Sequence, residues 1–294
     1  MQRKSFILPI TAVIIAAAAV ALRVSQLLGV VDYTEMGFFK ADADFWEANG
    51  LYLLLAGAAV MFILAAVIDK KIGSTAFSCS AETLVSKQTA ALGIAFIFGA
   101  CLRLYDLVFS FDRSMTLTAK TLIPLIGEAL IFLLLTIIGF IVLGSRKMKR
   151  ATGYLYLFIC ISYTMKAAEL FMKDTIIVRV SDELLLLLSY VASVLFFLAL
   201  GRFISGNESK FTRFKLFVFG GYTVTLSLCS SLAGYIALAQ DQSRMAKHMT
   251  MHPLSETGTA IIALAVLLAI YGSSADAVPV TYESDIDEEI NDVY

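Results

Sequence analysis

The chain has 294 residues, of which 59% are hydrophobic and 16% are charged, and its mean hydropathy is +0.81. A soluble globular domain is about 45–50% apolar and about 25% charged. The excess of apolar residues falls in long blocks, as it does in membrane spans. This composition excludes a soluble enzyme, a disordered chain and a secreted disulfide scaffold. It predicts an integral membrane protein that crosses the bilayer several times, with lipid as its main partner.

Net charge is −1, from 23 Lys and Arg against 24 Asp and Glu, so no overall basic field indicates a nucleic-acid partner. The four cysteines form no CxxC pair, and neither a zinc knuckle nor a disulfide framework is indicated. The sequence also lacks a P-loop, an HExxH motif and a GxSxG elbow. No cofactor is therefore predicted, and no catalytic motif marks the chain as an enzyme, although that question stays open.

Eight apolar blocks are long enough to cross a membrane as helices. We expect an all-α fold, a polytopic transmembrane helix bundle of about eight spans built from helical hairpins. The predicted spans cover approximately residues 5–28, 50–68, 88–109, 121–143, 152–172, 183–204, 214–239 and 255–272. The remaining residues, 273–294, are acidic and hold no Lys or Arg. We expect them to form a disordered tail, because such a segment buries too little apolar surface to order itself.

The distribution of Lys and Arg predicts the orientation in the membrane. The loops on the side of the N-terminus hold more Lys and Arg than the loops on the other side, and basic loops stay in the cytoplasm. With eight spans, this predicts a multi-pass protein of the cell membrane with both termini cytoplasmic. With seven spans, the tail would lie outside.

A short pattern, basic-x-x-polar-Leu, recurs near the ends of the first, third and fifth predicted spans. The three copies read Arg23-Val-Ser-Gln26-Leu, Arg103-Leu-Tyr-Asp106-Leu and Lys166-Ala-Ala-Glu169-Leu. They are separated by about one helical hairpin each, which suggests three related hairpins with the last two spans as a divergent fourth.

The depth of these residues follows from the helix rise of about 1.5 Å per residue. Arg103 and Lys166 lie roughly 22 Å along a hydrocarbon core of about 30 Å, and Arg23 lies at a similar height. Glu128, in the fourth span, lies roughly 10 Å below the outer surface. We therefore expect a shared layer of charge, with Arg103/Asp106 and Lys166/Glu169 paired at i and i+3 and Glu128 bridging to Arg103.

Charge inside a membrane is costly and usually faces a bundle interior or a watered cavity. One interpretation is structural: the charges lock the hairpins together, or the basic side chains snorkel to the interface. The other is functional, and it predicts a transporter or ligand-binding protein for a small anionic ligand, with an outward-facing pocket between spans 1, 3, 4 and 5. The candidate ligand-binding residues are Arg23, Gln26, Arg103, Asp106, Glu128, Lys166 and Glu169.

Two alternatives rest on other segments. The acidic tail, 273–294, could recruit a basic cytoplasmic partner, which would make the protein a non-catalytic membrane scaffold. The last outer loop carries Met245, His248 and His252, and imidazole with thioether ligands suits copper, especially Cu(I). The loop therefore makes a copper-handling membrane protein the third hypothesis.

The run from Arg23-Val-Ser-Gln-Leu-Leu-Gly-Val-Val-Asp32 to Met-Gly-Phe38 resembles a family of uncharacterised bacterial multi-span membrane proteins. The segment from Arg103 to Phe111 and the Gly201-Arg202 pair look similar to that family too. Met36 stands where the family often has Thr. The resemblance implies the same multi-span helical architecture, and it transfers no activity, substrate or catalytic residue.

Overall fold

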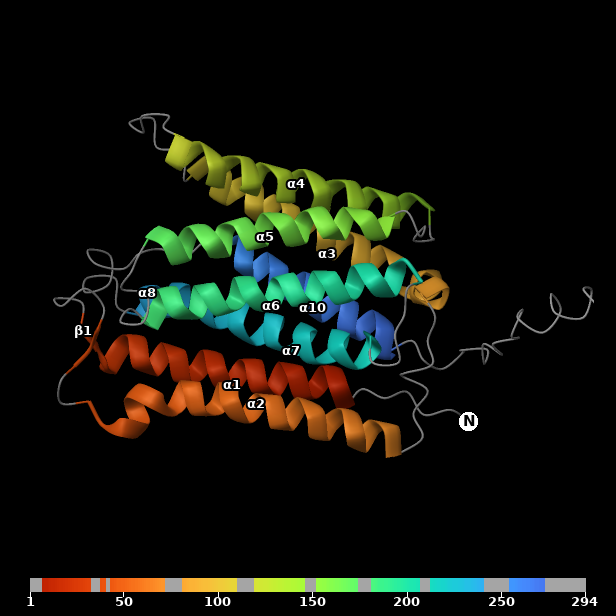
Figure 1. Cartoon of the computed structure of the whole chain (residues 1–294). Helices are drawn as coiled ribbons and strands as arrows, with labels where there is room; N and C mark the ends of the chain where they lie inside the picture. Colours follow the sequence, from red (N-terminus) through yellow and green to blue (C-terminus); the bar gives the residue numbers. More distant parts are fainter. Residues whose placement is uncertain are drawn as a thin grey trace, which may run out of the picture.

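The computed structural model describes residues 7–32, 38–40, 43–71, 81–109, 119–145, 152–173, 181–206, 212–240 and 254–272. Within them the chain forms a bundle of long helices that run side by side (Figure 1). The elements are α1 (Ile7–Gly29), β1 (Val31–Asp32), β2 (Phe38–Phe39), α2 (Phe45–Lys71), α3 (Ala81–Phe109), α4 (Ala119–Ser145), α5 (Gly153–Lys173), α6 (Ser181–Ile204), α7 (Thr212–Ser230), α8 (Leu232–Gln240) and α10 (Ser255–Gly272). The predicted all-α class is confirmed, and β1 and β2 are a two-residue antiparallel pairing between α1 and α2.

Every predicted span coincides with a helix, the seventh with α7 and α8 together. Among the residues that the structure describes, six stretches are long and apolar enough to cross a membrane, which supports a multi-pass integral membrane protein. They are Leu8–Gly29, Phe45–Ile68, Ala90–Val108, Leu125–Gly144, Asp182–Ile204 and Thr212–Gln240. The apolar part of α10, Ser255–Ile270, is shorter. The count of eight crossings, the direction of insertion and the cell membrane as the location stay predictions.

Six helices pack in a closed ring in the order α3, α4, α5, α6, α7, α10 and back to α3. The pair α1 and α2 lies outside this ring, against α7 (Figure 1). We call the end of the bundle where β1 lies the β1 end. The N-terminal halves of α4, α6 and α10 point to this end, as do the C-terminal halves of α1, α3, α5 and α7.

Glycines let the helices of the ring approach closely. A Cβ atom added at Gly258 on α10 would lie 2.9 Å from the Cα of Gly99 on α3, a separation that real Cβ atoms essentially never show. A Cβ atom added at Gly201 on α6 would lie 3.1 Å from the carbonyl oxygen of Gly153 on α5, so these two helices also approach closely. Small residues at helix crossings are typical of membrane bundles, because van der Waals packing must replace the hydrophobic effect there.

Gly220 and Gly221 on α7 serve the same purpose. A Cβ at Gly221 would lie 2.7 Å from the ring of Phe62 on α2, and one at Gly220 would lie 3.0 Å from Leu267 on α10. The two glycines therefore bring α7 close to α10 within the ring and to α2 outside it, so α7 joins the ring to the outer pair.

Candidate functional site: a charge cluster inside the bundle

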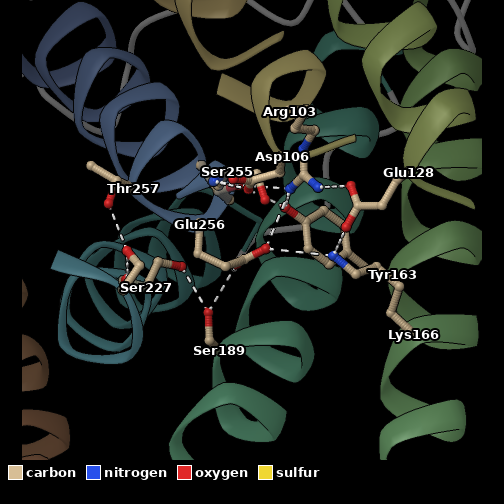
Figure 2. A network of polar contacts seen from close by, with 12 residues as sticks. Arg103, Asp106, Glu128, Tyr163, Lys166, Ser189, Ser227, Ser255, Glu256 and Thr257 are labelled. Carbon is tan, nitrogen blue, oxygen red and sulfur yellow. Dashed lines mark hydrogen bonds and ion pairs between the residues drawn. The ribbon is translucent and has the colours of Figure 1, made fainter. Parts of the chain in front are cut away.

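One polar network crosses the interior of the ring, and each of the six ring helices contributes to it (Figure 2). We call it the Arg103 cluster, and its members are Arg103 (α3), Glu128 (α4), Tyr163 and Lys166 (α5), Ser189 (α6), Ser227 (α7), and Glu256 and Thr259 (α10). The cluster holds two cations and two carboxylates, so its formal charge balances.

Arg103 is the hub of the cluster and is 1% exposed. Its Nη1 donates to Oε2 of Glu128 at 2.6 Å. Its Nη2 donates to Thr259 Oγ1 at 2.9 Å and to the Tyr163 hydroxyl, and it lies 3.4 Å from Oε1 of Glu256. A guanidinium has five N–H donors in a fixed fork, which is why one side chain can connect three helices.

Lys166 is the second cation, and it also pairs across helices. Its Nζ donates to Oε1 of Glu128 and lies 3.8 Å from Oε1 of Glu256. It also sits 4.4 Å from the ring centroid of Tyr190, a distance at which an ammonium gains from the negative face of the ring. Glu128 thus has one oxygen on Lys166 and the other on Arg103, as a carboxylate held between two cations.

The two carboxylates of the cluster differ in access. The Glu128 side chain is 19% exposed, whereas that of Glu256 is 0% exposed. Glu256 also has its Oε2 occupied, because Ser189 Oγ donates to it at 3.1 Å and lies 2.8 Å from Ser227 Oγ. Glu128 is therefore the acid that solvent or a ligand can reach, and Glu256 is a fixed internal counterion.

Glu256 reaches this position because α10 begins deep in the bundle. It lies in the first turn of α10, yet it contacts Ser189, which is about 12 Å along α6 from its start at Ser181. Figure 1 shows that α10 starts farther in from the β1 end than α6 starts or α5 ends. A helix that starts inside a membrane protein directs its N-terminal N–H groups and positive dipole end at whatever lies there.

Sequence reasoning missed Glu256, Tyr163, Thr259, Ser189 and Ser227. An acidic residue at the start of an apolar block is an ordinary sign of a helix N-terminus, so Glu256 does not stand out in the sequence. Its burial depends on the depth at which α10 starts, which no local pattern encodes. The available signal was a carboxylate within a block counted as a span.

A second group joins the outer helix pair to the ring and contains the first copy of the repeated pattern. This Arg23 group consists of Arg23 and Gln26 on α1 and Asp182 on α6. Arg23 pairs with the Asp182 carboxylate, and its Nη1 donates to Gln26 Oε1 at 3.1 Å. Gln26 Nε2 donates in turn to the carbonyl oxygens of Glu47 and Ala48 at 2.9 and 3.1 Å. The group therefore ties α1 to the first turn of α2 and to α6.

The predicted residues are thus divided between two sites. Arg103, Glu128 and Lys166 come together as expected, and Glu128 bridges α3 and α5. Arg103 pairs across helices and not with Asp106, whose Oδ2 accepts a hydrogen bond from the Ser255 backbone N–H at 2.6 Å. Arg23 and Gln26 join a different group, so the structure does not gather spans 1, 3, 4 and 5 around one set of contacts.

The remaining candidates are placed as follows. Glu169 lies half-buried on α5, one turn beyond Lys166. The candidate copper ligands Met245, His248 and His252 and the acidic tail, 273–294, lie outside the described residues. Within the described part of the chain, no three His, Cys, Asp or Glu side chains come together as a metal-ion site would require.

The fold and the buried charge define a polytopic α-helical integral membrane protein. Comparisons of the chain with protein-family models, with curated proteins and with solved structures find no match. The resemblance to bacterial multi-span proteins therefore stays a prediction, and function must be argued from the geometry of the cluster.

Proposed function

We propose that this integral membrane protein binds and transports a small organic anion, with Arg103 and Lys166 as the residues that hold its carboxylate. The observation that carries this proposal is the position of Glu128. Its carboxylate is held by one cation from α3 and one from α5, at the partly exposed side of the cluster. The chain's own carboxylate occupies a site of the shape and charge that a ligand carboxylate needs.

The cost of the cluster argues against a purely structural lock. Removing a charge from water costs several kcal/mol, and well-packed apolar side chains often stabilise a buried position as well as an ion pair does. Charged residues within membrane spans are rare for this reason and commonly mark substrate pathways. Arg103 and Glu256 are nearly or fully buried, so the bundle carries this cost permanently, and a binding role accounts for it.

The mechanism follows from the difference between the two acids. An incoming carboxylate displaces Glu128, which is partly exposed and turns its oxygens to water. Glu256 stays in place and keeps Arg103 and Lys166 from repelling one another. Transport additionally requires that the ligand binds two bundle conformations with different contacts, and the exchange of Glu128 for a ligand supplies that difference.

The other two hypotheses rest on segments outside the described ranges. Recruitment of a cytoplasmic protein uses the tail, 273–294, and copper handling uses Met245, His248 and His252. The geometry of the described residues adds no observation in favour of either, so the anion-binding proposal stands alone.

The test uses the purified full chain in nanodiscs and in proteoliposomes, with propionate as the probe. Glu128→Ala removes the resident carboxylate, so propionate should raise the melting temperature of this variant more than that of wild type. A hundredfold excess over Kd would add about 2.7 kcal/mol of stability. Labelled propionate should enter wild-type proteoliposomes.

Two further variants control this experiment. Arg103→Lys keeps the charge and loses the fork, so it should weaken propionate binding, whereas Arg202→Met removes an exposed cation near the other end of α6 and should leave it unchanged. The proposal fails if propionate stabilises neither wild type nor Glu128→Ala and no flux is seen.

A further inference from the structure

A second carboxylate sits beside the Arg103 cluster, at the N-terminus of α10. Asp106 Oδ2 accepts the Ser255 backbone N–H at 2.6 Å. The N-terminus of a helix carries roughly half a positive elementary charge and N–H groups that lack a partner within the helix, which makes it an anion site. Figure 2 shows Ser255 and Asp106 on one side of the Arg103 guanidinium and Glu128 on the other.

Two polar atoms at this position are buried without a hydrogen-bond partner. They are Oγ of Ser255, a residue that is 0% exposed, and Nε of Arg103, a residue that is 1% exposed. Buried polar atoms are almost always satisfied, so each exception calls for an explanation. A bound carboxylate whose oxygens reach these atoms, as those of Asp106 do not, would satisfy them.

Access supports exchange at both positions. Asp106 and Glu128 are each partly exposed, so both carboxylates can turn away to water. Glu256 faces Arg103, Lys166, Tyr163 and Tyr190, and it is fully buried. It therefore remains while the other two acids leave.

We propose that the anion is a dicarboxylate, and this inference rests on the proposed function. One carboxylate lies between Arg103 and Lys166 in place of Glu128. The other lies at the start of α10, against the Ser255 N–H and hydroxyl, in place of Asp106. The ligand brings two negative charges as two leave, so the charge of the site does not change. A monocarboxylate replaces one of them and leaves the α10 position to Asp106.

The experiment compares acids of matched length on the purified full chain in nanodiscs. Malonate, succinate and glutarate are measured beside acetate, propionate and butyrate by calorimetric titration. At least one dicarboxylate should bind about tenfold more tightly than its monocarboxylate counterpart, a difference of about 1.4 kcal/mol.

The variants act on the α10 position alone. Ser255→Ala removes the unpartnered hydroxyl and should weaken dicarboxylate binding several-fold while leaving monocarboxylate binding unchanged. Asp106→Ala removes the resident competitor and should strengthen dicarboxylate binding. Thr257→Val is the matched control, because its hydroxyl lies on the same turn of α10 and pairs with Ser231. Thr257→Val should change neither dicarboxylate binding nor monocarboxylate binding.

The outcomes separate this inference from the proposed function. Equal affinity for the two kinds of acid, or an equal loss for both in Ser255→Ala, overturns the dicarboxylate and leaves anion binding by Arg103 intact. If none of the six acids binds wild type, Asp106→Ala or Glu128→Ala and propionate shows no flux, both the inference and the proposed function are overturned.

Discussion

The Arg103 cluster and the Arg23 group begin from the same short pattern, a basic residue followed three positions later by a polar one. In both, the basic side chain is buried, at 0% exposure for Arg23 and 1% for Arg103. Their surroundings differ. Arg103 meets two carboxylates inside a ring of six helices, whereas Arg23 meets Asp182 and a glutamine that contacts backbone carbonyls at the edge of the bundle.

The basic-x-x-polar-Leu pattern therefore determines the depth of a charged residue, but it does not determine whether that residue is structural or functional. The cluster has more charge than a lock between two helices needs, and one of its acids is accessible. The Arg23 group has the contacts of a structural tie, because Gln26 uses its amide on the first turn of α2. Three stability measurements would sharpen or break the distinction.

The largest effect is expected from removing the two arginines in turn. Arg103→Met leaves Glu256 buried with a single, more distant cation, and breaking a buried pair in this manner costs about 3–5 kcal/mol. Arg23→Met should cost less, about 1–3 kcal/mol, because the Asp182 side chain is 13% exposed and can reach water. Unfolding by SDS in bicelles measures both, and equal losses would contradict the distinction.

A smaller effect is expected at the glycine contact that supports the cluster. Gly258 adjoins Thr259, which accepts a hydrogen bond from Arg103. Because Gly258 has no side chain, α10 can approach α3 closely. Gly258→Ala forces the two backbones apart and should cost about 1–3 kcal/mol. Gly57→Ala on α2 is the control, because a Cβ there meets nothing within 4 Å. It should stabilise slightly, since alanine is favoured over glycine in helices by about 0.5–1 kcal/mol.

Thermal unfolding of the two glycine variants in nanodiscs provides the measurement. A melting temperature lowered in Gly258→Ala and unchanged or raised in Gly57→Ala is the expected result. If both variants behave alike, the close contact between α3 and α10 does not hold the cluster together.

The smallest effect is expected in the Arg23 group. Gln26→Leu removes the amide that accepts from Arg23 and donates to the carbonyl oxygens of Glu47 and Ala48. The expected net cost is about 1 kcal/mol, because carbonyl oxygens in the first turn of α2 also accept helical N–H groups. Ser25→Ala, next to it on the exposed face of α1, is the matched control. Propionate binding should be the same in both variants, and a loss of binding in Gln26→Leu would place the Arg23 group in the anion site.

Much of the architecture could be predicted because a lipid bilayer imposes strong rules on a chain. Backbone groups in hydrocarbon must be satisfied within the segment, so long apolar blocks become helices. The constant rise per residue placed Arg103, Glu128 and Lys166 at one height. Glu128 was expected to bridge to Arg103 on that argument. The structure has this contact, and it adds a contact between Glu128 and Lys166 that was not expected.

The choice of partners could not be predicted. Height along a helix says nothing about rotation around the bundle, so Arg23 could not be separated from Arg103 by counting residues. The intrahelical pair expected between Arg103 and Asp106 does not form, because Arg103 contacts Glu128 and Glu256 on other helices. Asp106 turns instead to the N-terminus of α10.

By itself, the sequence determined that this chain is a helical bundle for a membrane and that it carries opposite charges at one depth, because hydropathy and helix rise act along the chain. The tertiary structure alone decided that six helices close into a ring, that α10 starts deep within it and that Glu256 completes the charge balance. Those outcomes depend on contacts between segments far apart in the chain. Glycines allow these segments to approach closely, and each buried charge is stabilised by an opposite charge on another helix.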